Sequence, residues 1–125
     1  MVNKYKNFEE LPVWKKAHNL TLLVYKLTEK FPGQEVYGLT SQVRRSSSSI
    51  AANIAEGFSR HSTKELVQFL YNARGSNAET LYHIMLAKDL GYIKDVSYIK
   101  MKNEYNEIGK QLNGWISSLR NKFSH

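Results

Sequence analysis

Apolar residues recur with the spacing of an α-helix in four separate segments of this chain. The first segment runs from about Pro12 to Phe31, and its apolar positions follow alternating steps of four and three residues. They are Val13, Ala17, Leu20, Val24, Leu27 and Phe31. Such steps place side chains on one stripe of a helix. Pro12 suits a first helical turn, and Pro32-Gly33 predicts where this helix ends.

The second segment, about Leu39 to Phe58, combines an apolar stripe with many small residues. Ser47 takes one place on a stripe otherwise formed by Leu39, Val43, Ile50 and Ile54. Four consecutive serines have low helix propensity, so we expect tertiary packing to stabilise this helix. Small side chains on several faces predict a helix that is covered on more than one side.

A capping-box pattern, Ser62-Thr63-Lys64-Glu65, opens the third predicted helix, which runs to about Leu90. Its apolar side consists of Leu66, Phe69, Leu70, Ala73, Leu81, Ile84 and Met85. Gly75 interrupts this pattern at a cost of about 1 kcal/mol relative to alanine. We therefore expect a packing reason for Gly75, with the small residues of the second helix as its partners. Gly91 is placed for a left-handed C-terminal cap.

The fourth segment starts near Asp95, a possible N-cap, and continues to the end of the chain. Its stripe is Met101, Tyr105, Ile108, Leu112, Trp115 and Leu119. Short connections make sequential helices antiparallel. The pattern predicts an all-α fold: a single-domain, up-down-up-down antiparallel four-helix bundle over residues 1–125, with a core at about 10–120 and frayed termini.

Composition and charge narrow the functional classes. The chain has no cysteine, which excludes disulfides and thiolate metal ligands. No apolar run approaches the roughly 18 residues of a membrane span, and the first residues lack an apolar signal segment. We expect a cytoplasmic protein without membrane contact. Lys and Arg number 18 against 11 Asp and Glu, and this net charge of +7 favours an anionic partner, nucleic acid first.

Motifs for chemistry are absent from the sequence. The Glu-x-x-His pairs of di-iron bundles do not occur, since Glu79 lies four residues before His83. We therefore expect no metal, no cofactor and no catalytic residue, and we expect His18 and His83 at surface or boundary positions. A hydrolytic triad stays open as an alternative because its members need not be adjacent in sequence.

Polar residues gather around the second and third predicted helices. They are Arg45, Asn53, Glu56, Arg60, Arg74, Ser76 and Glu79. One interpretation is a structural polar network that fixes the register of the two helices, since buried charges must be paired. The other is a ligand or catalytic cluster, which Glu56 and Glu79 would carry. We favour the structural network because no accompanying motif supports a site.

Basic residues are richest in the fourth predicted helix. We expect phosphate contacts, if nucleic acid is bound, from Arg44, Lys100, Lys102, Lys110, Arg120 and Lys122. Nearby aromatic residues such as Tyr98 can stack on bases. The alternative is the ordinary solvated face of a basic helix.

Four stretches of sequence carry a resemblance to a known family. They are Phe8-Glu9-Glu10-Leu11-Pro12-Val13-Trp14, the run from Gln42 through Asn53-Ile54-Ala55-Glu56-Gly57-Phe58, the run from Phe69 through Arg74-Gly75-Ser76 to Glu79, and Leu90-Gly91-Tyr92-Ile93. The chain resembles, from about residue 8 to 120, the four-helix-bundle proteins encoded in intervening sequences of bacterial 23S ribosomal RNA genes. Ala51 departs from the family pattern, in which proline is frequent.

The resemblance implies a homo-oligomer, a pentameric ring, and no enzymatic activity. It also implies relatedness to the accessory variability determinant of diversity-generating retroelements, a basic barrel that binds a reverse transcriptase and nucleic acid. Two functions follow as hypotheses: a non-enzymatic, homo-oligomeric binder of RNA or DNA, or a protein–protein adaptor for a polymerase-like partner such as a reverse transcriptase.

Overall fold

The computed structural model describes residues 4–123, which form four long helices and no strand. The helices are α1 (Pro12–Thr28), α2 (Leu39–Phe58), α3 (Thr63–Asp89) and α4 (Asp95–Phe123). Two short 3₁₀ helices, η1 (Phe8–Glu10) and η2 (Gly33–Glu35), precede α1 and α2. The predicted all-α class is confirmed.

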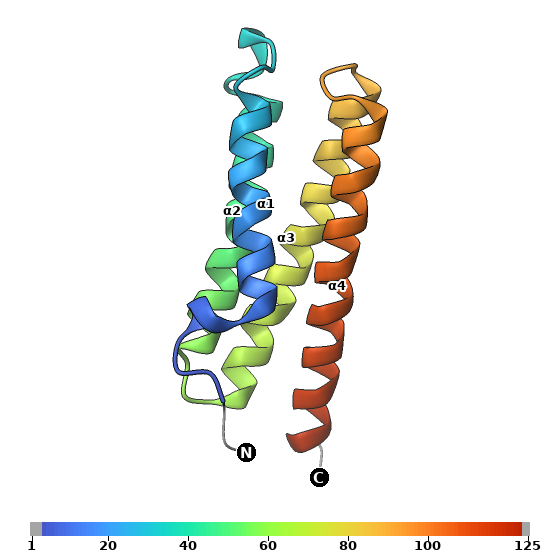
Figure 1. Ribbon diagram of the computed structural model, residues 1–125. Helices are drawn as coiled ribbons and strands as arrows, with labels where there is room; N and C mark the ends of the chain where they lie inside the picture. Colours follow the sequence, from blue (N-terminus) through green and yellow to red (C-terminus); the bar gives the residue numbers. More distant parts are fainter. Residues whose placement is uncertain (1–3, 124–125) are drawn as a thin grey trace.

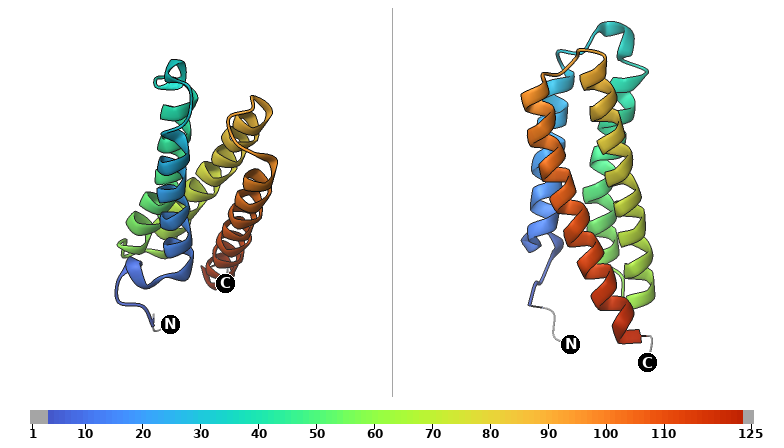
Figure 2. Two further views of the ribbon diagram at one scale, coloured as in Figure 1. Left: turned by 45° about the horizontal axis from the view of Figure 1, so that its top comes forward. Right: turned by 90° about the vertical axis from the view of Figure 1, so that its right-hand side faces the viewer.

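Successive helices run antiparallel and lie side by side (Figures 1 and 2). The last helix, α4, contacts both α3 and α1. The α2–α3 seam is the most extensive contact, and the α1–α4 seam is the least extensive of the four helix pairs in contact. This arrangement confirms the predicted up-down-up-down bundle. None of the described helices combines the length and the apolar run that crossing a bilayer requires.

The predicted start of the first helix is confirmed, but its end is not. The helix ends at Thr28, whereas the apolar stripe predicted an end at Phe31. The Phe31 N–H donates to the Thr28 carbonyl at 3.1 Å in a tighter turn. Pro32 explains this turn, because a proline disfavours the α conformation of the preceding residue. Phe31 instead packs its ring on Tyr92, with ring centroids 5.3 Å apart.

The other boundaries follow the sequence signals. The second helix has the predicted bounds, and the N–H of Glu65 donates to Ser62 Oγ at 3.0 Å, one of the two bonds of a capping box. The Glu65 carboxylate lies 3.8 Å from Arg60 Nη1. Gly91 has the predicted left-handed backbone, with φ of 82°. Asp95 is the first residue of α4, one position after the N-cap. Helical structure continues through Phe123, beyond the predicted fraying at 121, and residues 124 and 125 lie outside the described part.

The predicted stripes form most of the core. The largest fully buried side chains include Tyr105, Ile50, Ile54, Leu70, Ile108 and Leu112. One predicted core position is wrong: Met85 is 39% exposed. Trp115 is half-buried against the core, and Ile116 next to it is buried.

Small residues of α2 are buried on the sides that face α1 and α3, which confirms a helix covered on more than one side. They are Ser46, Ser47, Ala51 and Gly57. The expectation for Gly75 is wrong. Gly75 is exposed, and a Cβ added to it would meet nothing within 4 Å. It is the adjacent Ser76 that contacts α2, because a helical neighbour is rotated by about 100°.

Candidate nucleic-acid interface

A polar groove follows the seam between α3 and α4. It consists of two clefts of about 520 and 430 Å³ that share Asn113. The first is lined by Asn77, Asn103, Asn106, Glu107, Gly109, Lys110 and Asn113. The second is lined by Tyr71, Arg74, Asn113, Ile116, Ser117, Arg120 and Asn121. We call this surface, together with Lys102, the α3–α4 face. Glu107 is the one acidic residue among those that line its two clefts.

Four cations of this face form no ion pair with the acidic residues that the structure describes. No carboxylate of residues 4–123 lies within 4.0 Å of the side-chain nitrogens of Arg74, Lys102, Lys110 or Arg120. The Arg74 guanidinium lies over the Tyr71 ring, with Cζ 4.8 Å from its centroid. Lys102 Nζ lies 5.9 Å from the Tyr98 ring centroid. Among the described residues, the α3–α4 face therefore carries a net positive charge beside amide groups that can donate and accept hydrogen bonds.

Of the six basic residues singled out in the sequence, Lys110 lines the first cleft and Arg120 the second, and Lys102 lies on the same side of α4, one turn before Asn106. Lys122 is exposed one turn or less from the end of α4. Lys100 lines a groove on the other side of α4, between α4 and α1. Arg44 lies on α2 against α1, where its Nε donates to Thr28 Oγ1 at 2.8 Å. These six residues thus do not form one surface.

The sequence predicts Arg74 in the polar cluster of the second and third helices and does not reveal its place on this face. A signal existed for the α4 half of the face. Lys102, Asn106, Asn113 and Arg120 are separated by four, seven and seven residues, which places them along one side of a helix. Arg74 comes from α3, so its position depends on how the two helices pack.

The seven residues of the predicted polar network do not form one network. Asn53 and Ser76 are joined across α2 and α3, because both side chains hydrogen-bond to Ser49 Oγ at 3.0 Å. The other five lie outside this link. Glu56 and Arg60 form an exposed pair at 2.6 Å, Arg74 contacts Asn113 at 3.1 Å, Glu79 lies 3.2 Å from His83, and Arg45 is exposed. Arg74 faces α4, and the other four side chains pair within their own region or face solvent, which explains the separation.

Other polar residues, which the sequence analysis missed, connect the helices. Thr80 Oγ1 lies 2.9 Å from Ser46 Oγ, and the Asn77 amide donates to the Tyr105 carbonyl at 3.0 Å. His83 is 6% exposed, so the expectation of a surface or boundary position is wrong. His83 lies on the same side of α3 as Ser76 and Thr80, which faces α2.

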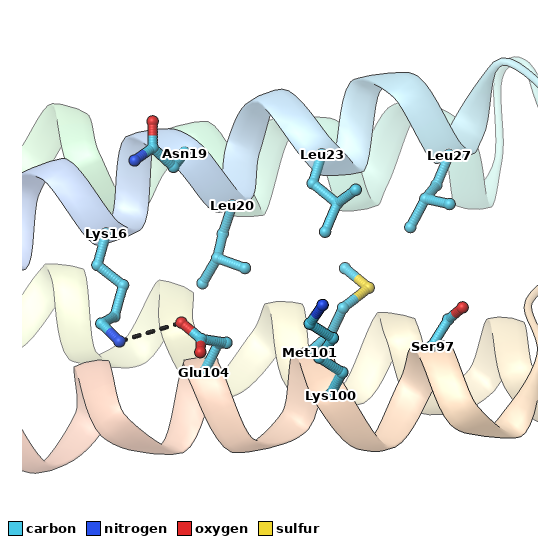
Figure 3. Close-up of a pocket in the computed structure, with 9 residues that line it drawn as sticks. All are labelled: Lys16, Asn19, Leu20, Leu23, Leu27, Ser97, Lys100, Met101 and Glu104. Atoms are coloured by element: carbon cyan, nitrogen blue, oxygen red, sulfur yellow. Dashed lines mark hydrogen bonds and ion pairs between the residues drawn. The ribbon is translucent and has the colours of Figure 1, made fainter.

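A second, apolar groove lies between α1 and α4, with a volume of about 650 Å³. Figure 3 shows Leu20, Leu23 and Leu27 of α1 pointing toward Met101 of α4. An ion pair between Lys16 Nζ and Glu104 Oε2, 3.0 Å long, closes one end. Among the described residues, no three His, Asp or Glu side chains are grouped as metal ligands.

The fold and its basic face place the chain in the class of small all-α bundle proteins. It belongs to the family of 23S rRNA-intervening sequence proteins, whose family model matches residues 9–114. It is also similar to the crystal structure of a protein of unknown function from the S23 ribosomal protein family of Bacteroides thetaiotaomicron. That match has a TM-score of 0.75 and 28% identity, and covers 83% of this chain and 97% of the other. No curated protein matches the chain. The family resemblance seen in the sequence is confirmed.

Proposed function

We propose that this protein binds nucleic acid through the α3–α4 face. The observation that carries the proposal is that Arg74, Lys102, Lys110 and Arg120 have no carboxylate of residues 4–123 within 4.0 Å of their side-chain nitrogens. A row of asparagines lies beside them. Lysine and arginine neutralise phosphates and release counterions, which supplies sequence-independent affinity. Asparagine amides can hydrogen-bond to phosphates, sugars and base edges. RNA and DNA both fit this chemistry.

We further propose that the binding species is a homo-oligomer, a pentameric ring, as the family resemblance implies. Five copies would carry a formal charge of about +35, which attracts polyanions over long range. Light scattering coupled to gel filtration tests this part. A mass five times that of the chain supports it, and a monomer at all concentrations contradicts it.

The nucleic-acid proposal is tested by removing charge from the face. Lys102→Gln combined with Lys110→Gln should weaken binding to an RNA hairpin roughly tenfold at about 100 mM salt. The slope of log K against log salt concentration should become less steep by about two units, because two phosphate contacts are lost. The matched control is Lys15→Gln with Lys26→Gln, which removes two exposed charges from α1. Equal losses in the two double variants, or no binding by the parent at about 50 mM salt, would overturn the proposal.

A protein–protein adaptor is the second candidate, and the apolar groove between α1 and α4 favours it. A partner helix could place apolar side chains against Leu23 and Leu27. The partner class that the resemblance suggests is a polymerase-like protein, such as a reverse transcriptase. A stoichiometric complex that survives nuclease and is lost in Leu23→Glu would support the adaptor.

The proposal includes no catalytic step, and no cofactor. Glu56 and Glu79, which would carry such a step, are exposed and paired with Arg60 and His83. Turnover of any substrate that Glu56→Gln or Glu79→Gln abolishes would contradict this part.

A further inference from the structure

The second cleft of the α3–α4 face, toward the end of α4, is lined by two arginines that both contact the same tyrosine. Arg74 of α3 and Arg120 of α4 both line this cleft of about 430 Å³. A single residue, Tyr71, holds both. Its ring lies under the Arg74 guanidinium at 4.8 Å, and its hydroxyl oxygen accepts a hydrogen bond from Arg120 Nη1 at 2.8 Å. Two cationic groups are therefore kept at one site by an uncharged residue.

The contrast with Arg60 shows what the cleft lacks. Arg60 also lies over an aromatic ring, that of Phe69, but it has two carboxylate partners, Glu56 at 2.6 Å and Glu65 at 3.8 Å. Within residues 4–123, neither Arg74 nor Arg120 has one within 4.0 Å. Bringing like charges together without a counter-charge is unfavourable, and a bound anion would remove this cost.

The donors around the cleft suit a phosphate group. Each guanidinium has five N–H donors in a planar fork, and one donor of each is used by Asn113 Oδ1 and Tyr71 Oη. The remaining donors match the bidentate geometry of phosphate oxygens. The Asn113 amide and the Ser117 hydroxyl line the same cleft and can donate as well.

We propose that Arg74, Arg120, Asn113 and Ser117 form a discrete phosphate-binding site, with Tyr71 as the residue that positions the two guanidiniums. The ligand chemistry is a phosphate group, whether from a nucleic-acid strand or from a small phosphorylated molecule. If the source is a nucleic acid, the site rests on the proposed function and deepens it. It would then fix one phosphate of the strand at the end of the groove that lies toward the C-terminal end of α4.

The test uses inorganic phosphate as the probe in ¹⁵N-edited NMR titrations at low ionic strength. Binding in roughly the millimolar range should shift the amide signals around residues 71–74 and 113–120. Arg74→Gln with Arg120→Gln should abolish these shifts, and Arg120→Lys should weaken binding although the charge is kept, because lysine lacks the fork. Tyr71→Phe should weaken binding less than loss of an arginine. Arg45→Gln, which removes an exposed arginine of α2, should leave it unchanged.

A second arm uses a single-stranded oligonucleotide. Binding of phosphate without binding of the oligonucleotide supports the site and contradicts the proposed function. Binding of the oligonucleotide that Arg74→Gln with Arg120→Gln weakens no more than Arg45→Gln contradicts the site and leaves the function standing. Shifts that are scattered over the molecule, or unchanged in a double variant with parental circular dichroism, also overturn the site.

Discussion

At the residue scale, two buried polar atoms are notable. Tyr105 Oη and Asn77 Oδ1 have no hydrogen-bond partner within residues 4–123. Tyr105 is fully buried, and this burial raises the pKa of its hydroxyl above the ordinary value of 10.0. Burying a hydroxyl without a hydrogen-bond partner lowers the free energy of unfolding. The ring of Tyr105 therefore stabilises the core, whereas its hydroxyl destabilises it.

Tyr105→Phe should therefore leave the free energy of unfolding unchanged or raise it by about 1 kcal/mol at neutral pH. The folded-state pKa lies above the unfolded-state pKa, so the stability linked to this group is complete below about pH 10 and is lost as the pH rises further. Urea unfolding near pH 7 and near pH 11 should show a smaller alkaline loss in the variant. Tyr37→Phe, at a position 97% exposed, is the control and should behave as the parent. An equal alkaline loss in Tyr105→Phe would contradict this account.

At the element scale, two helical glycines lie in very different surroundings: Gly57 is in the packed α2–α3 seam, and Gly75 is on an exposed side of α3. A Cβ on Gly57 would lie 2.8 Å from Phe69 Cβ and 3.1 Å from Leu66 Cδ1, while one on Gly75 would meet nothing within 4 Å. A glycine-to-alanine substitution gains helix propensity at both positions, but it adds a packing clash only at Gly57. The effects on stability should therefore be opposite at the two glycines.

Gly57→Ala should lower the free energy of unfolding by about 1–3 kcal/mol, since overpacking of a rigid seam exceeds the propensity gain. Gly75→Ala should raise it by about 0.5–1 kcal/mol. Chemical denaturation of both variants measures this difference. A stabilised Gly57→Ala would show that α2 and α3 are less closely packed than the distances indicate.

Most elements could be predicted from the sequence because their signals are local. The stripes of α1, α2 and α4, the Ser62 cap and the Gly91 turn each depend on residues within a few positions of one another. The wrong predictions concern residues whose burial depends on how a neighbouring helix packs. His83 is buried on the side of α3 on which Ser76 and Thr80 contact α2, and Gly75 lies on an exposed side of α3. The cleft with Arg74 and Arg120 joins residues 46 positions apart, which no local pattern reveals.

At the scale of the whole molecule, the four seams are unequal. The α2–α3 seam buries Ser46, Gly57 and Thr80, whereas α1 and α4 leave a groove of about 650 Å³ between them. Regions with few buried contacts open with a lower free energy than the rest of the fold. We therefore expect the side of α1 that faces α4 to open more readily than the α2–α3 seam.

Hydrogen exchange should show this inequality. Amides on the side of α1 that faces α4, around Leu23 and Leu27, should exchange faster than those around Ile50 and Ile54 of α2. Native-state exchange followed by NMR or mass spectrometry measures the rates. Uniform protection across α1 and α2 at low protein concentration would contradict the prediction. Protection of α1 that grows with concentration would indicate that another copy covers the groove.

Both ends of the described chain leave the bundle at the same end (Figure 1). Arg120 lies one turn before the end of α4, so the cleft that it shares with Arg74 is near that exit. A domain or strand tethered after α4 by a short flexible linker would face this cleft at an effective concentration of roughly millimolar. Even an intrinsically weak contact would then be well populated, so a fusion placed after α4 changes what the cleft encounters.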